Sequence, residues 1–172
     1  MKTRLIFSLV AASLLAPLAG RAADAAPTPA EAKPKLAVVI AESLGFRTQP
    51  NDDFIRLDIA FNKVAKERNW PVEIVMERFA ANVPDYENEI DIFTQPIRQE
   101  LPGEYTLRGW ATLTVNGKKH DFGIVKADYR PRLGEWMDDA LQKLSLVYAN
   151  AVADKVEPIL FPKEQARPAK SS

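Results

Sequence analysis

The chain has 172 residues, no cysteine, and equal numbers of basic and acidic side chains, 23 of each. The absence of cysteine excludes disulfides, a thiolate nucleophile, cysteine metal ligands and a lipidated cysteine anchor. The balanced charge without a basic run argues against nucleic-acid binding and against binding to anionic membrane surfaces.

The first residues have the layout of a secretory signal peptide. Lys2 and Arg4 precede an uncharged run over residues 5–19, and small residues follow. This run of 15 residues is shorter than the roughly 20 that a membrane-spanning helix needs. We therefore predict a cleaved signal peptide over residues 1–22 and a bacterial protein located in the periplasm or secreted. An uncleaved anchor and a eukaryotic secretory origin are the alternatives.

Cleavage removes three basic residues and leaves 20 basic against 23 acidic ones, a net charge of −3. No stable membrane anchor remains in such a mature chain. The Pro/Ala-rich stretch 23–35 predicts a disordered tether, and the polar stretch 163–172 predicts a disordered tail. A single α/β domain is expected over residues 36–162.

The domain begins with a short apolar run at 36–41, typical of a buried strand. Asn51, Asp52 and Asp53 suit the start of a helix that we expect to reach about Arg68. Its apolar side chains recur at three- and four-residue steps and predict one buried face: Phe54, Leu57, Phe61 and Val64.

Alternating apolar and polar residues predict further strands over 72–77, 90–93, 105–115 and 118–129. The dipeptide Asn116-Gly117 between the last two is typical of a two-residue hairpin turn. Counting outward from this turn without irregularity places Trp110 opposite Gly123.

A second helix is expected over about 135–156, with one apolar face from Trp136 to Val152. The order β-α-β-β-β-β-α predicts an α/β (α+β) fold. We expect a two-layer sandwich: a mixed, mostly antiparallel sheet of about five strands with both helices on one face. The second face of the sheet would then be open.

No pattern in the chain indicates catalysis, a metal site or a cofactor. His120 is the single histidine, which excludes a catalytic triad and a two-histidine metal site. A strand-end structural role is expected for it, with an acid–base role as the alternative. The seven scattered glycines form no phosphate-binding loop. We predict that the protein is not an enzyme, has no cofactor and holds no metal.

Two charged clusters are interpreted as solvated surface. Alternating carboxylates run from Asp85 to Asp91 but lack the glycine and distal glutamate of a calcium loop. We expect an acidic loop there, with a calcium site as the alternative. Lys126, Arg130 and Arg132 read as a charged connector, and an anion site is the alternative, opposed by acidic residues at the start of the following helix.

The sequence feature most suggestive of function is Trp110, which the alternation places on the open sheet face beside Arg108. Phe93 and Val125 are expected on the same face. Tryptophan beside arginine is frequent in interface anchors, so we predict a partner-binding surface of Trp110, Arg108 and Phe93. The alternative is structural: Trp110 covers the gap left by Gly123 or is shielded by loop 94–104.

These features favour an exported, non-enzymatic interaction or envelope accessory module that binds another protein or a second copy of itself. The alternative is a small-ligand carrier with a pocket between the sheet and the helices. A hydrolase that uses carboxylates is a third hypothesis, which no motif supports.

Overall fold

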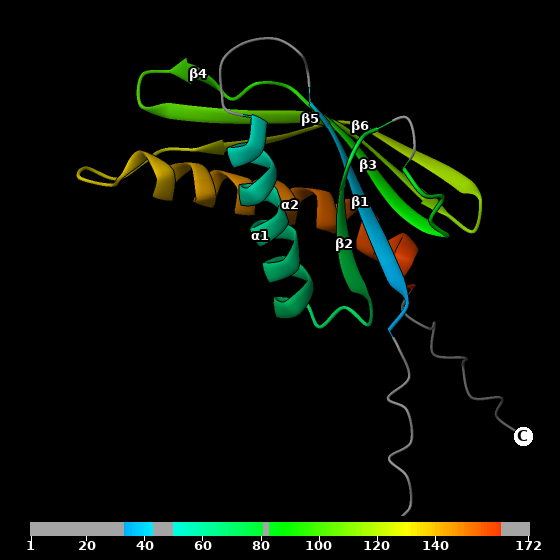
Figure 1. Ribbon diagram of the computed structural model, residues 1–172. Coiled ribbons are helices and arrows are strands. Elements are labelled where there is room, and N and C mark those ends of the chain that lie inside the picture. The colour runs from blue at the N-terminus through cyan, green and yellow to red at the C-terminus, as the bar shows by residue number, and fades with distance from the viewer. Residues whose placement is uncertain (1–32, 43–49, 81–82, 163–172) are drawn as a thin grey trace, which may run out of the picture. The chain divides into compact units, whose positions relative to one another are not determined.

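The computed structural model describes residues 33–42, 50–80 and 83–162 (Figure 1). The predicted signal peptide, most of the predicted tether and the predicted tail lie outside these residues. Within them, neither helix combines the length and the apolar character needed to cross a bilayer.

The described part contains two helices and six strands. In chain order they are β1 (Lys35–Glu42), α1 (Pro50–Glu67), β2 (Glu73–Arg78), β3 (Asn88–Thr94), β4 (Arg98–Leu101), β5 (Glu104–Val115), β6 (Lys118–Tyr129) and α2 (Met137–Leu160). The predicted fold class and element order are confirmed, and the structure adds β4 in the segment expected to be a loop.

The six strands form one mixed sheet in which β1 is central to the parallel part. The order is β2-β1-β3-β5, and both β4 and β6 pair with β5. β1 is parallel to both β2 and β3, whereas the pairs of β5 with β3, β4 and β6 are antiparallel. The chain therefore passes across β1 between β2 and β3.

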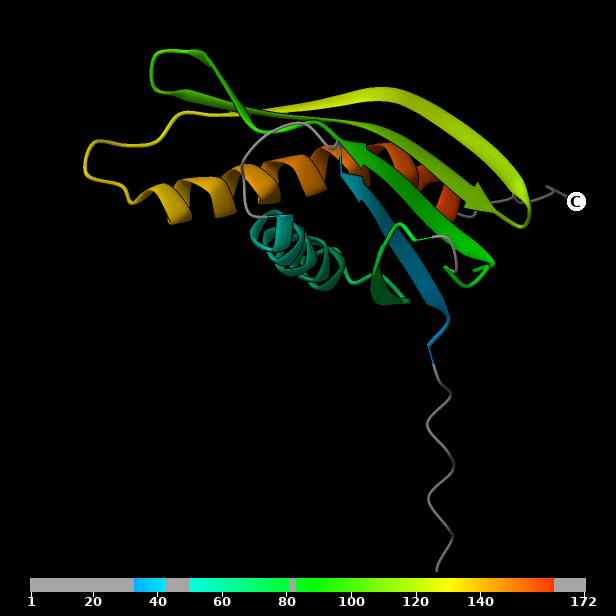
Figure 2. The ribbon, with the colours of Figure 1, turned by 45° about the horizontal axis from the view of Figure 1, so that its top comes forward.

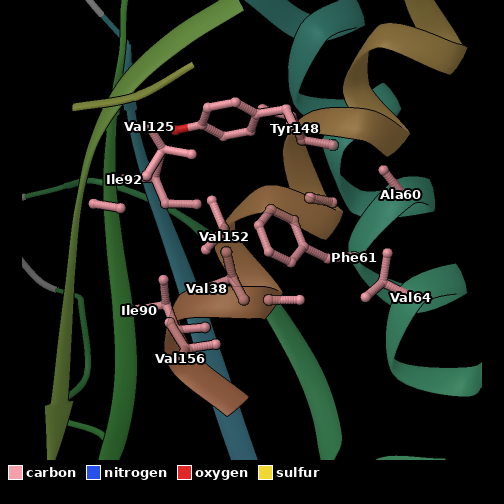
Figure 3. Close-up of a cluster of buried hydrophobic side chains, with 14 of the residues drawn as sticks. Val38, Ala60, Phe61, Val64, Ile90, Ile92, Val125, Tyr148, Val152 and Val156 are labelled. Carbon is pink, nitrogen blue, oxygen red and sulfur yellow. The ribbon is translucent and has the colours of Figure 1, made fainter. Parts of the chain in front are cut away.

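Both helices pack on one face of the sheet. α2 runs along β5 and β6, and α1 packs against α2 and β2 (Figure 2). Apolar side chains from the sheet, such as Val38, Ile90 and Ile92, meet Phe61 of α1 and Tyr148 of α2 in the buried core (Figure 3). The predicted apolar face of α1 is confirmed, since Leu57, Phe61 and Val64 are all buried.

One close contact in this core depends on a glycine in β5. A Cβ atom added at Gly109 would overlap the hydroxyl of Tyr148 and would lie 3.2 Å from the carbonyl oxygen of Phe93. The Tyr148 hydroxyl is buried and has no hydrogen-bond partner, and this burial raises the pKa of Tyr148. Gly109 is therefore required by the packing of α2 on the sheet.

The β5–β6 hairpin has the expected register only next to its turn. Leu113 lies opposite His120 as predicted, but the register then shifts and Trp110 lies opposite Ile124 rather than Gly123. The prediction for Trp110 was wrong because it assumed an uninterrupted ladder. An extra residue in β6 forms a β-bulge, which displaces all later pairs by one position.

The bulge is held by one carboxylate and one glycine. Gly123 has a φ of +66°, and its backbone N–H donates to Asp121 Oδ1 at 2.8 Å. Because strand side chains alternate between faces, the extra residue changes which side chains point outward. Ile124 takes the outward place, while Val125, expected on the open face, is buried in the core.

The face away from the helices is only partly open. Val39 of β1 lies on this face and is buried, and its register partner Glu77 accepts a hydrogen bond from the Tyr86 hydroxyl at 3.0 Å. Tyr86 belongs to residues 83–87, which precede β3, so this described segment lies over β1 on that face (Figure 2). The exposed area is therefore found over β3, β5 and β6.

Candidate interaction surface

Three large apolar side chains form a row across three adjacent strands on this face. Phe93 of β3 is the register partner of Trp110 of β5, and Trp110 is the partner of Ile124 of β6. Their exposed fractions are 50%, 49% and 56%. We call these three residues the apolar row.

The position of Trp110 follows from the alternation of β5 and from the bulge. Its neighbours Gly109 and Ala111 face the helices and are buried, so the indole points outward. The indole Nε1–H donates to Asp121 Oδ1 at 2.9 Å, the same oxygen that accepts the bond from Gly123. The bulge therefore orients Trp110 as well as placing Ile124 beside it.

Carboxylates border the apolar row on the side nearer the hairpin turn. Asp91 of β3 and Asp121 of β6 lie one step along their strands from the row, and both are aligned with Thr112 of β5. The hydroxyl of Thr112 donates to Asp91 Oδ2 at 3.2 Å. We call Asp91 and Asp121 the acidic row.

Glu89 lies one step beyond Asp91 on the same face of β3. Its burial, followed by a hydrogen bond to Asp91 and repulsion from Asp91 and Asp85, raises the pKa of Glu89 to about 7, while Lys119 opposes the shift. The structure corrects the expected acidic loop in part, because β3 begins at Asn88 and includes Glu89, whereas Asp91 was already expected in the strand over 90–93. In the described residues no acidic or histidine cluster is arranged to hold a metal ion.

Basic side chains border the apolar row on its other side. Arg108 of β5 is the register partner of Lys126 of β6, and Arg98 of β4 is the partner of Thr106. Arg98, Thr106 and Arg108 line a shallow hollow together with Gln95 and Pro96. We call Arg98, Arg108 and Lys126 the basic group.

One carboxylate lies within the basic group. Asp128 accepts a hydrogen bond from the Thr106 hydroxyl at 2.5 Å and forms an ion pair of 3.0 Å with Lys126. The bond from Thr106, then Lys126 and Arg108, lowers the pKa of Asp128. Asp128 thus offsets part of the positive charge without reversing it.

Lys126 and Arg130 of the predicted charged connector pair with separate carboxylates. Lys126 pairs with Asp128, and Arg130 pairs with Glu104 at 3.3 Å. The backbone N–H of Arg132 donates to the carboxylate of Glu135 at 2.8 Å. This arrangement agrees with a charged connector and does not favour an anion site.

The carboxylate of Glu135, just before α2, accepts hydrogen bonds from several donors. Besides Arg132, Lys143 at 2.8 Å and the hydroxyl of Tyr129 at 3.0 Å donate to its carboxylate. The bond from Lys143, followed by that from the Arg132 backbone, lowers the pKa of Glu135 to about 2. This network fixes the connector on which the next side chains lie.

A second group of exposed apolar side chains follows this connector: Leu133, Trp136 and Met137. Trp136 and Met137 were expected on the buried face of the last helix, but they are 80% and 50% exposed. The expectation was wrong because α2 begins only at Met137 and Trp136 is its N-cap residue. These side chains lie at a helix end, whereas the apolar row lies on paired strands.

The structure brings together the three residues expected to bind a partner: Phe93, Trp110 and Arg108 share one face of the sheet. Sequence reasoning missed Ile124, because the bulge was not anticipated. The signal was present in Gly123, since a glycine inside a strand pattern often marks a bulge.

Comparisons with known proteins assign this chain to no family and give low structural similarity. No protein-family model matches the chain, and no curated protein matches it. A solved hypothetical protein from Chlamydia trachomatis is 9% identical, with a TM-score of 0.49, covering 77% of this chain and 100% of that chain. The rare lipoprotein B from Shewanella oneidensis is 12% identical, with a TM-score of 0.27, covering 72% and 90%.

A third solved structure is a homologue of neuraminyllactose-binding hemagglutinin from Helicobacter pylori. It is 12% identical with a TM-score of 0.30, and the match covers 74% of this chain and 83% of that chain. Similarity at this level says nothing about the function of this chain.

Proposed function

We propose that this protein is an exported, non-enzymatic module that binds a protein chain through the apolar row and the charged residues beside it. The observation that carries the proposal is the row itself: Phe93, Trp110 and Ile124 are neighbours on three paired strands, and each is about half exposed. Export is supported by the signal-peptide layout of the first 22 residues.

The rigidity of this surface favours binding over a merely tolerated exposure. The three side chains project from hydrogen-bonded strands, and Asp121 fixes the indole of Trp110. A group that is already oriented loses less conformational freedom when a partner binds. Tryptophan and arginine are also the residue types that contribute most strongly to protein interfaces.

The arrangement of charge fits the same role. The apolar row is bordered by carboxylates on one side and by the basic group on the other. Protein interfaces combine an apolar centre with a polar rim, and charged rims select the partner and its orientation.

No observation favours the small-ligand carrier. Its pocket would lie between the sheet and the helices, where Phe61, Tyr148 and Val152 are fully buried and packed together (Figure 3). The interaction module is therefore the function that the geometry supports best.

Native mass spectrometry of the tagged full chain, isolated from its own host, tests the proposal. We expect wild type to carry a second protein chain and Trp110→Ala to lose it, because the substitution removes the largest side chain of the surface. Trp136→Ala is the matched control, since it removes an exposed tryptophan elsewhere and should keep the complex.

Two results would reject this proposal. One is a bare monomer for wild type, and the other is a complex that survives Trp110→Ala. Extra mass from a small molecule that unfolding releases would instead support the carrier.

A further inference from the structure

We infer that the partner on this surface is a second copy of the same chain, packed face to face about a two-fold axis that runs along the apolar row. This inference rests on the proposed function, because it requires the face to be a binding surface.

The order of side chains along each strand separates acidic from basic residues. On β6, Asp121 precedes Ile124 and Lys126 follows it. On β3, Asp91 precedes Phe93, and on β5 Arg108 precedes Trp110, but β5 runs antiparallel to both strands. All the carboxylates of the acidic row therefore lie on one side of the apolar row, and the basic group lies on the other.

A two-fold rotation about an axis along the apolar row has two consequences. It places each residue of the row against the same residue of the other copy, so that Trp110 faces Trp110. It also exchanges the two sides, so that the acidic row of each copy faces the basic group of the other. The contact is isologous and self-complementary, as closed dimers require.

The other two-fold axis parallel to the sheet is disfavoured by the same charges. An axis along the strands would leave each side facing itself and would bring Asp91 and Asp121 against the acidic row of the second copy. Like charges placed opposite each other across an interface oppose association. The charge pattern thus selects the axis along the row.

Specific opposite charges meet in the selected arrangement. Asp121 and Lys126 lie on either side of Ile124 in β6, so Asp121 of one copy lies over Lys126 of the other, twice by symmetry. Arg108 comes over the part of the second copy that carries Thr112 and Asp91. Asp128 weakens the positive side, where Arg98, Arg108 and Lys126 outnumber it and Glu104 is paired with Arg130. Lys119, the register partner of Thr114, weakens the acidic side in the same way.

Opposite charge substitutions at one position test this geometry. Ile124 is 56% exposed, so Ile124→Lys and Ile124→Glu should both fold. Each variant alone would place two like charges at the axis, and an equal mixture would place lysine against glutamate. We expect the wild-type mature chain, without residues 1–22, to sediment as a dimer at about 100 µM, each variant to dimerise at least tenfold more weakly, and the mixture to recover a mixed dimer.

Ile59→Lys serves as the matched control, because Ile59 is 51% exposed on α1, away from this face. It should leave the dimer unchanged. Thermal unfolding of each sample shows whether a variant is folded.

Three results would overturn the inference: a monomeric wild type, variants that dimerise like wild type, or a mixture that stays monomeric. A monomeric wild type that still binds a different protein, and loses it in Trp110→Ala, would reject the second copy but keep the proposed function. If neither Trp110→Ala nor the Ile124 variants change any association, both the second copy and the proposed function are rejected.

Discussion

Adjacent residues of β5 point to opposite faces of the sheet, and the two faces differ in the substitutions that they tolerate. Gly109 and Ala111 face the helices and are buried. The core is closely packed against Gly109, where an added Cβ atom would overlap its neighbours. Trp110 between them faces away and is half exposed. The covered face determines whether the chain folds, and the open face can contribute to binding without being needed for the core.

The largest effect is expected on the covered face. Gly109→Ala would place a Cβ atom against the Tyr148 hydroxyl and within 3.2 Å of Ile92 and the Phe93 carbonyl. Overpacking of this kind costs about 1–3 kcal/mol, and we expect a loss of about 3 kcal/mol in the free energy of unfolding. Urea denaturation measures this loss. Adding Tyr148→Phe should recover part of it, and no recovery would show that the hydroxyl is not the obstacle.

A smaller loss is expected where the open face contributes to the fold. Asp121→Ala removes the acceptor of the Gly123 and Trp110 hydrogen bonds. Each such bond contributes about 1 kcal/mol, so we expect unfolding to become easier by about 1–2 kcal/mol. Asp121→Asn keeps an oxygen acceptor and should lose less. Equal losses for alanine and asparagine would indicate that charge, rather than bulge geometry, matters at this position.

The carboxylate pair in β3 predicts a pH dependence on the open face. The pKa of Glu89 is raised to about 7 in the folded protein, chiefly by burial and then by Asp91, above the ordinary value of about 4.3. The folded state therefore binds this proton more tightly, and the contribution of Glu89 to stability declines as pH rises through this interval.

Glu89→Gln removes that decline. Urea denaturation at about pH 5 and about pH 8 should show a smaller loss of stability between the two pH values for Glu89→Gln than for wild type. Glu87→Gln is the control, because Glu87 is exposed and lies before β3 begins. Identical pH profiles for wild type and Glu89→Gln would contradict the assigned pKa.

The smallest effect is expected from Tyr148→Phe. The Tyr148 hydroxyl is buried without a hydrogen-bond partner, and such a group destabilises the folded state by its lost hydration. Tyr148→Phe should therefore lower the free energy of unfolding by less than about 1 kcal/mol or should raise it. Urea denaturation that shows a loss of about 2 kcal/mol or more would mean that the hydroxyl has a partner in solution.

Much of the fold could be predicted from the sequence because its periodic signals are strong. The apolar steps of α1 and the alternation of β5 gave the correct buried faces. β4 was missed because its four residues, flanked by Pro96 and Pro102, show too little alternation to indicate a strand.

The candidate site was predicted only in part. Phe93 and Trp110 were placed on one face by alternation alone, which the structure reproduces. Ile124 and Val125 exchanged places because a bulge shifts the register of every residue that follows it. Asp91 and Asp121 of the acidic row come together because β3 and β6 both pair with β5, and local patterns do not specify the pairing of β3 with β5.

The central claim is that the open face binds while the covered face folds the chain. The most direct test measures association by sedimentation equilibrium and unfolding by urea on the same samples of wild type and Trp110→Ala. The account predicts an association at least tenfold weaker for Trp110→Ala, about 1.4 kcal/mol, with a loss of about 1–2 kcal/mol in the free energy of unfolding that leaves the variant folded. A variant that loses stability and leaves association unchanged would identify Trp110 as part of the core and contradict the claim.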